Sequence, residues 1–181
     1  MMLNRQEQQG AALITGLIFM VVLTLLAIAA MRTTGLEEKM SANAMNQDLA
    51  FQSAEAALRQ GVAQVYSGTI TSTSGFVSGC SATGLCLPST TATPIWNTVF
   101  PFGQTAPSGL AATFSGTPLT GVANAPQYII ELLPNVPVTA GNSIVMGRSA
   151  GSGTVTPFRI TARGWGLAAE AQATTQAAYL Y

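Results

Sequence analysis

The chain has 181 residues, about the length of one domain, and only 8% of them are charged. Seven basic and seven acidic residues give a formal net charge of zero, which excludes a polybasic nucleic-acid binder and an acidic disordered tail. Because the chain has no histidine, Ser-His-Asp catalysis, Cys-His catalysis and metal sites that need imidazole are excluded as well. We therefore expect no enzyme, no cofactor, no metal site and no nucleic-acid partner.

The first predicted element is an apolar helix near the N-terminus. Residues 10–31 read GAALITGLIFMVVLTLLAIAAM, and their only hydroxyls belong to Thr15 and Thr24. A helix of this length spans about 33 Å, close to the ~30 Å thickness of the hydrocarbon core of a bilayer. Threonine hydroxyls can bond to carbonyls of their own helix, so they do not oppose burial in lipid. The segment predicts a transmembrane helix.

Three fates are open for this helix. It can remain as a signal anchor, or it can be a secretory signal that is cleaved after the small-x-small pattern Ala27-Ile28-Ala29. Alternatively, only the polar leader at residues 1–10 is removed. The charges near the two ends of the span are too few to decide its orientation.

The helical pattern continues beyond the apolar segment. An apolar stripe at steps of three or four residues is broken only at Gln47: Leu36, Met40, Ala44, Gln47, Phe51, Ala54, Leu58, Val62 and Val65. No proline occurs before Pro88. We expect one helix from Ala11 to Tyr66, apolar over 11–31 and amphipathic over 32–66, with Gly35 as its weakest point and Gly61 as an alternative end.

These features resemble the N-terminal part of type IV prepilins, and more narrowly that of the PilX family of minor pilins. The residues that carry the resemblance are GAALI at 10–14, LLAIAAMRTTGLEEKM at 25–40 and QDLAFQSAEAALR at 47–59. A weaker similarity covers PQYIIE at 126–131 and FRITARG at 158–164, whereas residues 67–125 match no pattern. The resemblance implies a pilin-like α+β fold, with one long N-terminal helix and a small antiparallel β-sheet head with long irregular loops over residues 67–181.

The resemblance also implies how the chain is processed. Gly10 would be the last residue of the leader, and prepilin peptidase would cleave before Ala11 on the cytoplasmic side. Ala11 would then be the N-methylated mature N-terminus, where many pilins have an aromatic residue. The fifth mature position, which is a glutamate in most prepilins, is Thr15 here. Because Thr15 cannot pair with the terminal amine of a neighbour, we expect a subunit at the tip, where that contact is not needed.

The function implied by the resemblance is that of a minor pilin in a tip or priming complex. Such a complex starts pilus assembly and supports twitching motility and surface attachment. The partners would be minor pilins of the PilV, PilW, PilE and FimU types, the major pilin and a PilY-type adhesin. The chain would first cross the inner membrane once, with a periplasmic head, and then enter the fibre. Two alternatives are a tip-type pseudopilin of a type II secretion system and an anchored or secreted binding protein unrelated to pili.

The middle of the chain is unusual because residues 60–130 contain no charged residue. Their Ser, Thr, Gly, Ala and Pro content is compatible with disorder or with a loop-rich fold. We favour a folded segment with flexible loops, because six larger side chains can anchor it: Ile95, Trp96, Val99, Phe100, Phe102 and Phe114.

Clearer strands follow. Residues 127–133 are rich in β-forming residues between two prolines, and residues 158–163 alternate apolar with polar side chains. After a turn at 164–168, residues 170–181 alternate again, which predicts an antiparallel hairpin. Three or four strands packed on the helix stripe would complete the head.

The head contains two cysteines and a few charged residues whose possible roles can be compared. Cys80 and Cys86 predict a disulfide in an exported domain, with a pair of free thiols as the alternative. Glu131 and Glu170 are the only two carboxylates beyond residue 60, and we expect a solvated pair there rather than an acid-base pair. Arg159 and Arg163 share one strand face and can form salt bridges with these carboxylates.

Overall fold

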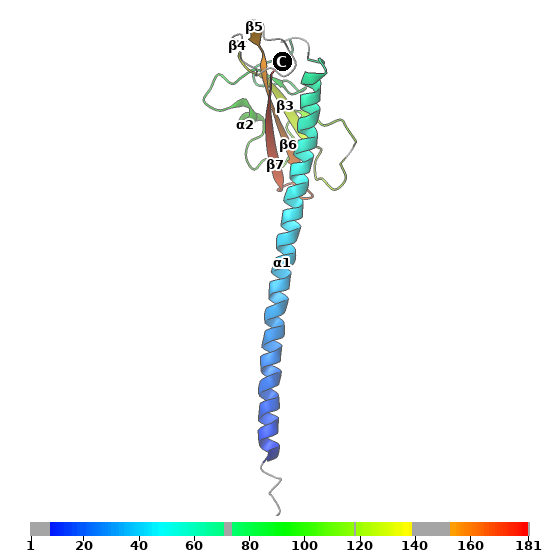
Figure 1. The fold of residues 1–181 in the computed structure, drawn as a ribbon, viewed down its shortest axis with the longest axis vertical. Coiled ribbons are helices and arrows are strands. Elements are labelled where there is room, and N and C mark those ends of the chain that lie inside the picture. Colours follow the sequence, from blue (N-terminus) through cyan, green and yellow to red (C-terminus); the bar gives the residue numbers. More distant parts are fainter. Residues whose placement is uncertain (1–7, 71–73, 118, 139–152, 181) are drawn as a thin grey trace, which may run out of the picture. The chain divides into compact units, whose positions relative to one another are not determined.

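The computed structural model describes residues 8–70, 74–117, 119–138 and 153–180 (Figure 1). The chain divides into two compact units, Met1–Ala44 and Met45–Tyr181. We call the first the N-terminal unit and the second the head, and each is described by itself. Most of the expected leader, residues 1–7, lies outside the described residues.

A single helix, α1, runs from Gln8 to Tyr66 and supplies residues to both units. It ends where the sequence pattern predicted, and it passes through Gly35 and Gly61 without a break. Gly61 is needed for packing rather than for ending the helix. A Cβ atom at this position would lie only 2.7 Å from Cγ2 of Ile160 and 3.0 Å from the ring of Tyr128.

The head is built on a five-stranded sheet in the order β1-β3-β6-β7, with β2 as a second partner of β3. Its strands are β1 (Leu85–Cys86), β2 (Ala112–Thr113), β3 (Gln127–Leu132), β6 (Pro157–Trp165) and β7 (Gln172–Leu180). All pairings are antiparallel except that of β1 with β3, which is parallel. The predicted hairpin is confirmed as β6 and β7, which pair in register over nine residue pairs.

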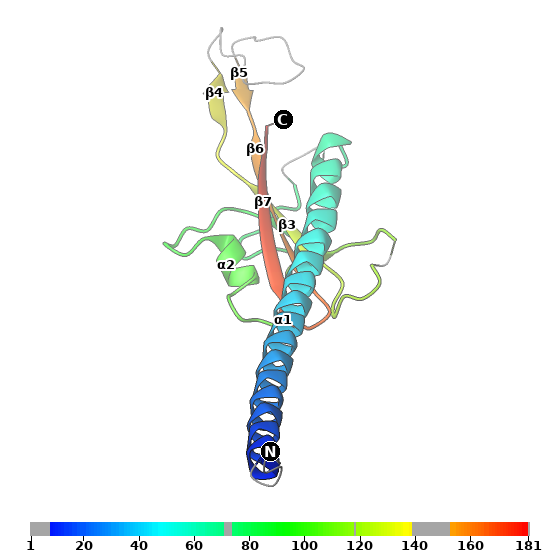
Figure 2. The same ribbon diagram turned by 60° about the horizontal axis from the view of Figure 1, so that its bottom comes forward.

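Three further elements, one helix and two strands, belong to the head. A short helix, α2 (Ile95–Val99), lies in the charge-free segment, and the strands β4 (Val136–Val138) and β5 (Gly153–Val155) pair with each other in a separate two-stranded sheet. Figure 2 shows this small sheet extending beyond the N-terminal end of β6. The sequence analysis predicted neither of these two strands.

One face of the main sheet packs on the part of α1 that belongs to the head. The core between them contains Leu58, Val65, Tyr128, Ile130 and Ile160. Helix and sheet approach closely because small residues line the contact on both sides: Ala50, Ala54, Ala57 and Gly61 on α1, and Ala162, Gly164 and Gly166 on and after β6. A Cβ atom at Gly164 would collide with the Ser53 side chain and with the helix backbone.

The helix stripe predicted from the sequence is therefore only partly correct. Ala54, Leu58 and Val65 are buried, but Phe51 is half exposed and Ala50 and Ser53 are buried in its place. Leu36 and Met40 are exposed. The reason is that close packing against glycines selects small side chains, which a search for large apolar residues overlooks. The interruption at Gln47 is explained, since its amide donates to the carbonyl of Gln172 at 3.0 Å.

The opposite face of the sheet is covered by the charge-free segment, which is folded as expected. Ile95, Val99 and Phe100 are buried there with Ile129 and the two cysteines. Phe114 packs against the core between the sheet and α1, and Trp96 lies at the edge of the cluster on the opposite face. The expectation for Phe102 is wrong, because its side chain is fully exposed.

Candidate functional site

The start of α1 holds the residues that the resemblance marks for processing. Gly10 and Ala11 both lie inside the helix. The hydroxyl of Thr15 donates to the backbone carbonyl of Ala11 at 3.0 Å and also lies 3.1 Å from that of Ala12. This hydrogen bond gives the hydroxyl of Thr15 a partner within its own helix. No carboxylate occupies this position, so an ion pair with an amine cannot form through it.

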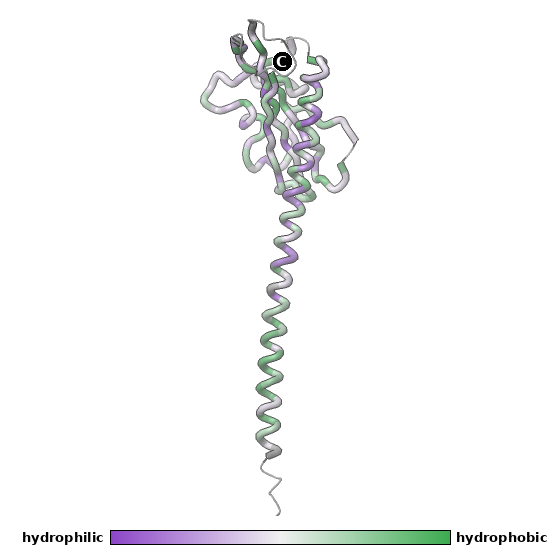
Figure 3. The backbone as a smooth tube through the Cα atoms, viewed as in Figure 1, coloured by the Kyte–Doolittle hydropathy of each residue, from purple (hydrophilic) through white to green (hydrophobic). Residues whose placement is uncertain are grey.

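The first half of α1 is suited to a membrane. It is the one helix among the described residues that is long and apolar enough to cross a bilayer, judged by its length and composition. Figure 3 shows mostly hydrophobic (green) colouring along its lower part. Every described side chain from residue 10 to residue 44 is exposed, including Leu17, Phe19 and Leu25. This exposed apolar surface requires lipid or protein around it.

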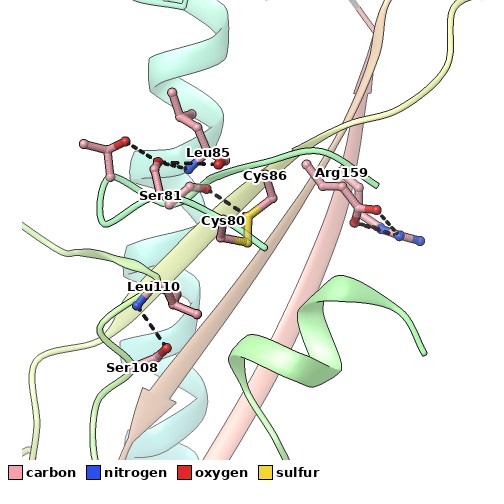
Figure 4. Close-up of a disulfide and its surroundings, with 10 residues drawn as sticks. Cys80, Ser81, Leu85, Cys86, Ser108, Leu110 and Arg159 are labelled. Atoms are coloured by element: carbon pink, nitrogen blue, oxygen red, sulfur yellow. Dashed lines mark hydrogen bonds and ion pairs between the residues drawn. A yellow bond between two sulfur atoms is a disulfide. The ribbon is translucent and has the colours of Figure 1, made fainter. Parts of the chain in front are cut away.

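The two cysteines are joined by a disulfide beside strand β3 (Figure 4). Cys86 is fully buried and Cys80 almost so. The enclosed loop is closed further by Ser81, whose backbone N–H donates to the carbonyl of Leu85 at 3.1 Å. Cys80 adopts a φ of 70°, a left-handed conformation that costs a residue other than glycine about 1–2 kcal/mol. The disulfide thus fixes a strained turn against the sheet.

Glu131 and Arg159 form a bidentate ion pair across β3 and β6. Nε and Nη2 of Arg159 each donate to a different carboxylate oxygen of Glu131 at 2.8 Å. Only 2% of the Glu131 side chain is exposed, against 32% for Arg159. The expectation of a solvated carboxylate is therefore wrong for Glu131, while the expected salt bridge is confirmed. Glu131 is buried because the charge-free segment covers this face of the sheet.

Glu170 does not converge with this pair. It lies in the turn after Trp165, and Trp165 is six residues along β6 from Arg159, which corresponds to about 20 Å. An acid-base pair of the kind that cleaves glycosides needs its two carboxylates within about 10 Å. Among the described residues no group of three metal-ligating side chains occurs.

Arg163 is the polar residue whose role the sequence did not reveal. It is buried, and its guanidinium donates to the carbonyls of Phe100 and Pro101 at 2.7 and 2.8 Å. It also lies 5.3 Å from the centre of the Phe100 ring. Burial lowers the pKa of this guanidinium. Arg163 therefore holds the segment after α2 on the sheet, and no local pattern around residue 100 signals this contact.

Two glutamines act in the same way. The amide of Gln172 donates to the carbonyl of Gln104 at 2.7 Å. Gln127 accepts from the backbone N–H of Ser108 at 2.7 Å and donates to its carbonyl at 2.9 Å. The long loop between α2 and β2 is thus tied to the sheet at residues 100, 101, 104 and 108.

Comparison with protein families gives two matches that together cover most of the chain. The family model described as PilX N-terminal matches residues 9–59. The one described as type IV pilus assembly protein PilX C-term matches residues 80–180, which is more than half of the chain. Comparisons with curated proteins and with solved structures give no match. The geometry agrees with the family matches, since α1 carries the first region and the sheet with its disulfide carries the second. The chain therefore belongs to the PilX family of type IV pilus assembly proteins.

Proposed function

We propose that this chain is a minor pilin that acts in a tip or priming complex and starts assembly of the type IV pilus. Membership of the PilX assembly family supports the association with the pilus. In this proposal prepilin peptidase cleaves between Gly10 and Ala11, and Ala11 is then N-methylated. The apolar part of α1 anchors the subunit in the inner membrane with a periplasmic head and later packs among other helices in the fibre.

The observation that carries the tip position is the hydrogen bond of Thr15. A glutamate at this position is buried in hydrocarbon and gains from pairing with the amine of a neighbouring subunit. Thr15 instead satisfies its hydroxyl on Ala11 of its own helix, at 3.0 Å. Such a subunit gains nothing from a neighbour at this point. We therefore place it at an end of the assembly.

The partners follow from the same proposal. They are minor pilins of the PilV, PilW, PilE and FimU types, the major pilin and a PilY-type tip adhesin. Support for twitching motility and surface attachment would be indirect, through the start of assembly. The family matches give no support to a type II secretion pseudopilin or to a binding protein unrelated to pili.

Processing is tested by the intact mass and the N-terminal peptide of the protein from membranes and from sheared pili. A mature chain that starts at Ala11 with one added methyl group, found in both fractions, is the expected result. A start at Ala30 would indicate a secretory signal, and an uncleaved start would indicate a signal anchor. Either result would overturn the proposal.

The tip position is tested by Thr15→Glu, with Thr24→Glu as the matched control. Thr24 also bonds to its own helix, to the carbonyl of Val21 at 2.8 Å, so both variants place a carboxylate in the span at the cost of the same type of contact. We expect Thr15→Glu to raise the number of copies per fibre and to spread them away from the tip, as seen by immunogold labelling. Thr24→Glu should only reduce membrane insertion. An unchanged distribution for Thr15→Glu would contradict the proposed role of this position.

A further inference from the structure

The two edges of the main sheet differ in how they are covered. Along one edge, β3 is paired over most of its length, because β2 covers Gln127 and Tyr128 and β1 covers Ile130 and Glu131. At the other edge, β7 pairs only with β6 among the described strands. Figures 1 and 2 both show β7 at the border of the sheet. The chain thus uses two short segments to close one edge and leaves the other edge open.

The backbone groups at the open edge can be assigned from the hairpin. The N–H of Gly166 donates to the carbonyl of Ala171 at 2.8 Å, and in an antiparallel pair the bonded positions alternate from there. The residues of β7 that bond to β6 are therefore Ala173, Thr175, Ala177 and Tyr179. The residues whose N–H and C=O groups point away from β6 are Gln172, Thr174, Gln176, Ala178 and, at the end of the strand, Leu180.

Among Gln172, Thr174, Gln176 and Ala178, only Gln172 has a hydrogen-bond partner for its outward backbone groups within the described part of the chain. The carbonyl of Gln172 accepts from the amide of Gln47, whereas no described residue bonds to the backbone of Thr174, Gln176 or Ala178. The side chains of the latter three are exposed. Three consecutive outward positions thus form an open hydrogen-bonding row along the strand.

This edge lacks the features with which proteins block unwanted strand pairing. Such edges usually carry a charged residue, a proline or a bulge, or are very short. Residues 172–180 have no charge and no proline, and their register with β6 is unbroken over nine pairs. An edge of this length and composition is a template for a further strand.

We propose that the row from Thr174 to Ala178 accepts an extended strand from another subunit of the pilus. The inference rests on the proposed function. A strand is the occupant because unpaired N–H and C=O groups spaced two residues apart are matched by another extended backbone. On the face toward α1, Ala177 and Tyr179 lie at the margin of the apolar core, so an apolar side chain of the added strand would extend that core. On the other face, Thr174 and Gln176 suit neutral polar neighbours.

A second copy of this chain fits less well. Antiparallel pairing of β7 with itself follows a twofold axis, which reverses the direction of the head part of α1 between the two copies. Subunits that repeat along a polar fibre are related head to tail, without such a twofold axis. A strand from a different subunit has no such restriction.

The test compares the wild type with Gln176→Pro and Gln176→Thr. The N–H of Gln176 points away from β6, so proline removes a donor from the open row without breaking the hairpin, and edge strands tolerate proline at such positions. Both variants lose the bond from the Gln176 amide to the Thr161 hydroxyl at 2.9 Å, so Gln176→Thr is the matched control. A retained disulfide and an unchanged thermal midpoint for Gln176→Pro in the membrane fraction would confirm that it folds.

We expect the wild type and Gln176→Thr in sheared pili, and Gln176→Pro there at about one tenth of their level, since a lost hydrogen bond changes binding by about that factor. Equal recovery of all three overturns the inference and leaves the proposed function standing. Absence of the wild type from pili overturns the proposed function and this inference with it. If Gln176→Pro misfolds, amide hydrogen exchange of residues 172–180 in the wild type is measured instead. The inference requires that these amides exchange more slowly in pili than in membranes, and equal rates would overturn it.

The strand donor is identified in the same pili with a maleimide-linked diazirine attached to the thiol of Gln176→Cys, because light converts the diazirine to a carbene that inserts into whatever chain lies beside it. A cross-linked product that contains this chain and a different pilus subunit is the expected result. A product with twice the mass of this chain would overturn the assignment to another subunit.

Discussion

The two faces of the main sheet are covered by different means. Toward α1, the strands present apolar side chains such as Ile130 and Ile160, and small residues bring helix and sheet into close contact. On the opposite face, the strands present Gln127, Glu131 and Arg163, and the cover is a long charge-free segment. The first contact is held by packing, and the second largely by hydrogen bonds from strand side chains to loop backbone groups.

This difference shows how a segment of low complexity can be ordered without many apolar residues of its own. The polar groups that hold its loop between α2 and β2 belong to strands β3, β6 and β7, which lie later in the chain than this loop. The two faces should therefore respond differently to substitution. Changes on the sheet face that packs on α1, the helix face, should destabilise the whole head. Changes on the opposite face, the loop face, should release only the segment that covers it.

The largest effect is expected for Gly164→Ala on the helix face. The added methyl group would collide with Ser53 and with the α1 backbone. Neither the helix nor the strand can move away without losing its packing contacts with the other. We expect a loss of about 3 kcal/mol in the free energy of unfolding. Urea unfolding of the full chain in detergent micelles, followed by tryptophan fluorescence, measures this. Gly109→Ala is the control, because a Cβ atom there meets nothing within 4 Å; equal losses for the two variants would refute the packing argument.

A smaller loss is expected for Arg163→Lys on the loop face. A lysine ammonium lacks the planar fork that reaches the carbonyls of Phe100 and Pro101 together, so one buried acceptor loses its partner. The expected cost is about 2 kcal/mol, with faster amide exchange confined to residues 95–105. Arg159→Lys, at a partly exposed position, should leave that segment protected. Uniformly faster exchange throughout the head of Arg163→Lys would argue against separate anchoring of the loop.

Reduction of the disulfide should have a still smaller effect on global stability. A bridge over six residues constrains little chain entropy, and the chain-entropy estimate is about 2 kcal/mol. Relief of the left-handed conformation at Cys80 would lower the net loss further. Thermal unfolding of the full chain with and without reductant measures the loss. A loss of unfolding free energy as large as that expected for Gly164→Ala would contradict the smaller role that we assign to the sheet face opposite α1.

The smallest effect concerns Tyr128 at alkaline pH. Burial raises the pKa of its phenol, and the side-chain amides of Gln64 and Gln60, which hydrogen-bond to it, oppose this shift in part. The unfolded chain therefore releases the proton more readily, and stability is complete below about pH 10 and falls as the pH rises above it. Tyr128→Phe should abolish this loss, at a cost of about 1 kcal/mol near neutral pH. Unfolding midpoints from pH 8 to pH 11 check it; a parallel decline in both proteins would assign the loss to other groups.

The elements with strong local patterns were predictable. The end of α1 at Tyr66 follows from an apolar stripe that continues to Val65, and β3, β6 and β7 follow from alternation and from flanking prolines. The pair of nearby cysteines indicated the disulfide. In each case the signal lies within a few residues of the element that it predicts.

What could not be predicted depends on contacts between distant segments. The two-residue strands β1 and β2 exist only because β3 offers them an edge, and their own sequences carry no periodicity. Phe102 was expected in the core because it is aromatic, but Arg163 fixes the carbonyls of the two preceding residues and leaves its side chain outside. Likewise, Glu131 is buried because of a covering segment far away in the chain.

The hydroxyls of Thr15 and Thr24 have a consequence for how the apolar part of α1 changes its surroundings. Both are already bonded to carbonyls of the same helix, to Ala11 and Val21. Transfer of residues 12–31 from lipid to a protein neighbour, or back again, breaks neither of these two hydrogen bonds and moves no charged side chain. Van der Waals contacts then dominate the exchange, and selection between neighbours depends on surface shape. In such a segment, neither threonine hydroxyl favours lipid over protein surroundings.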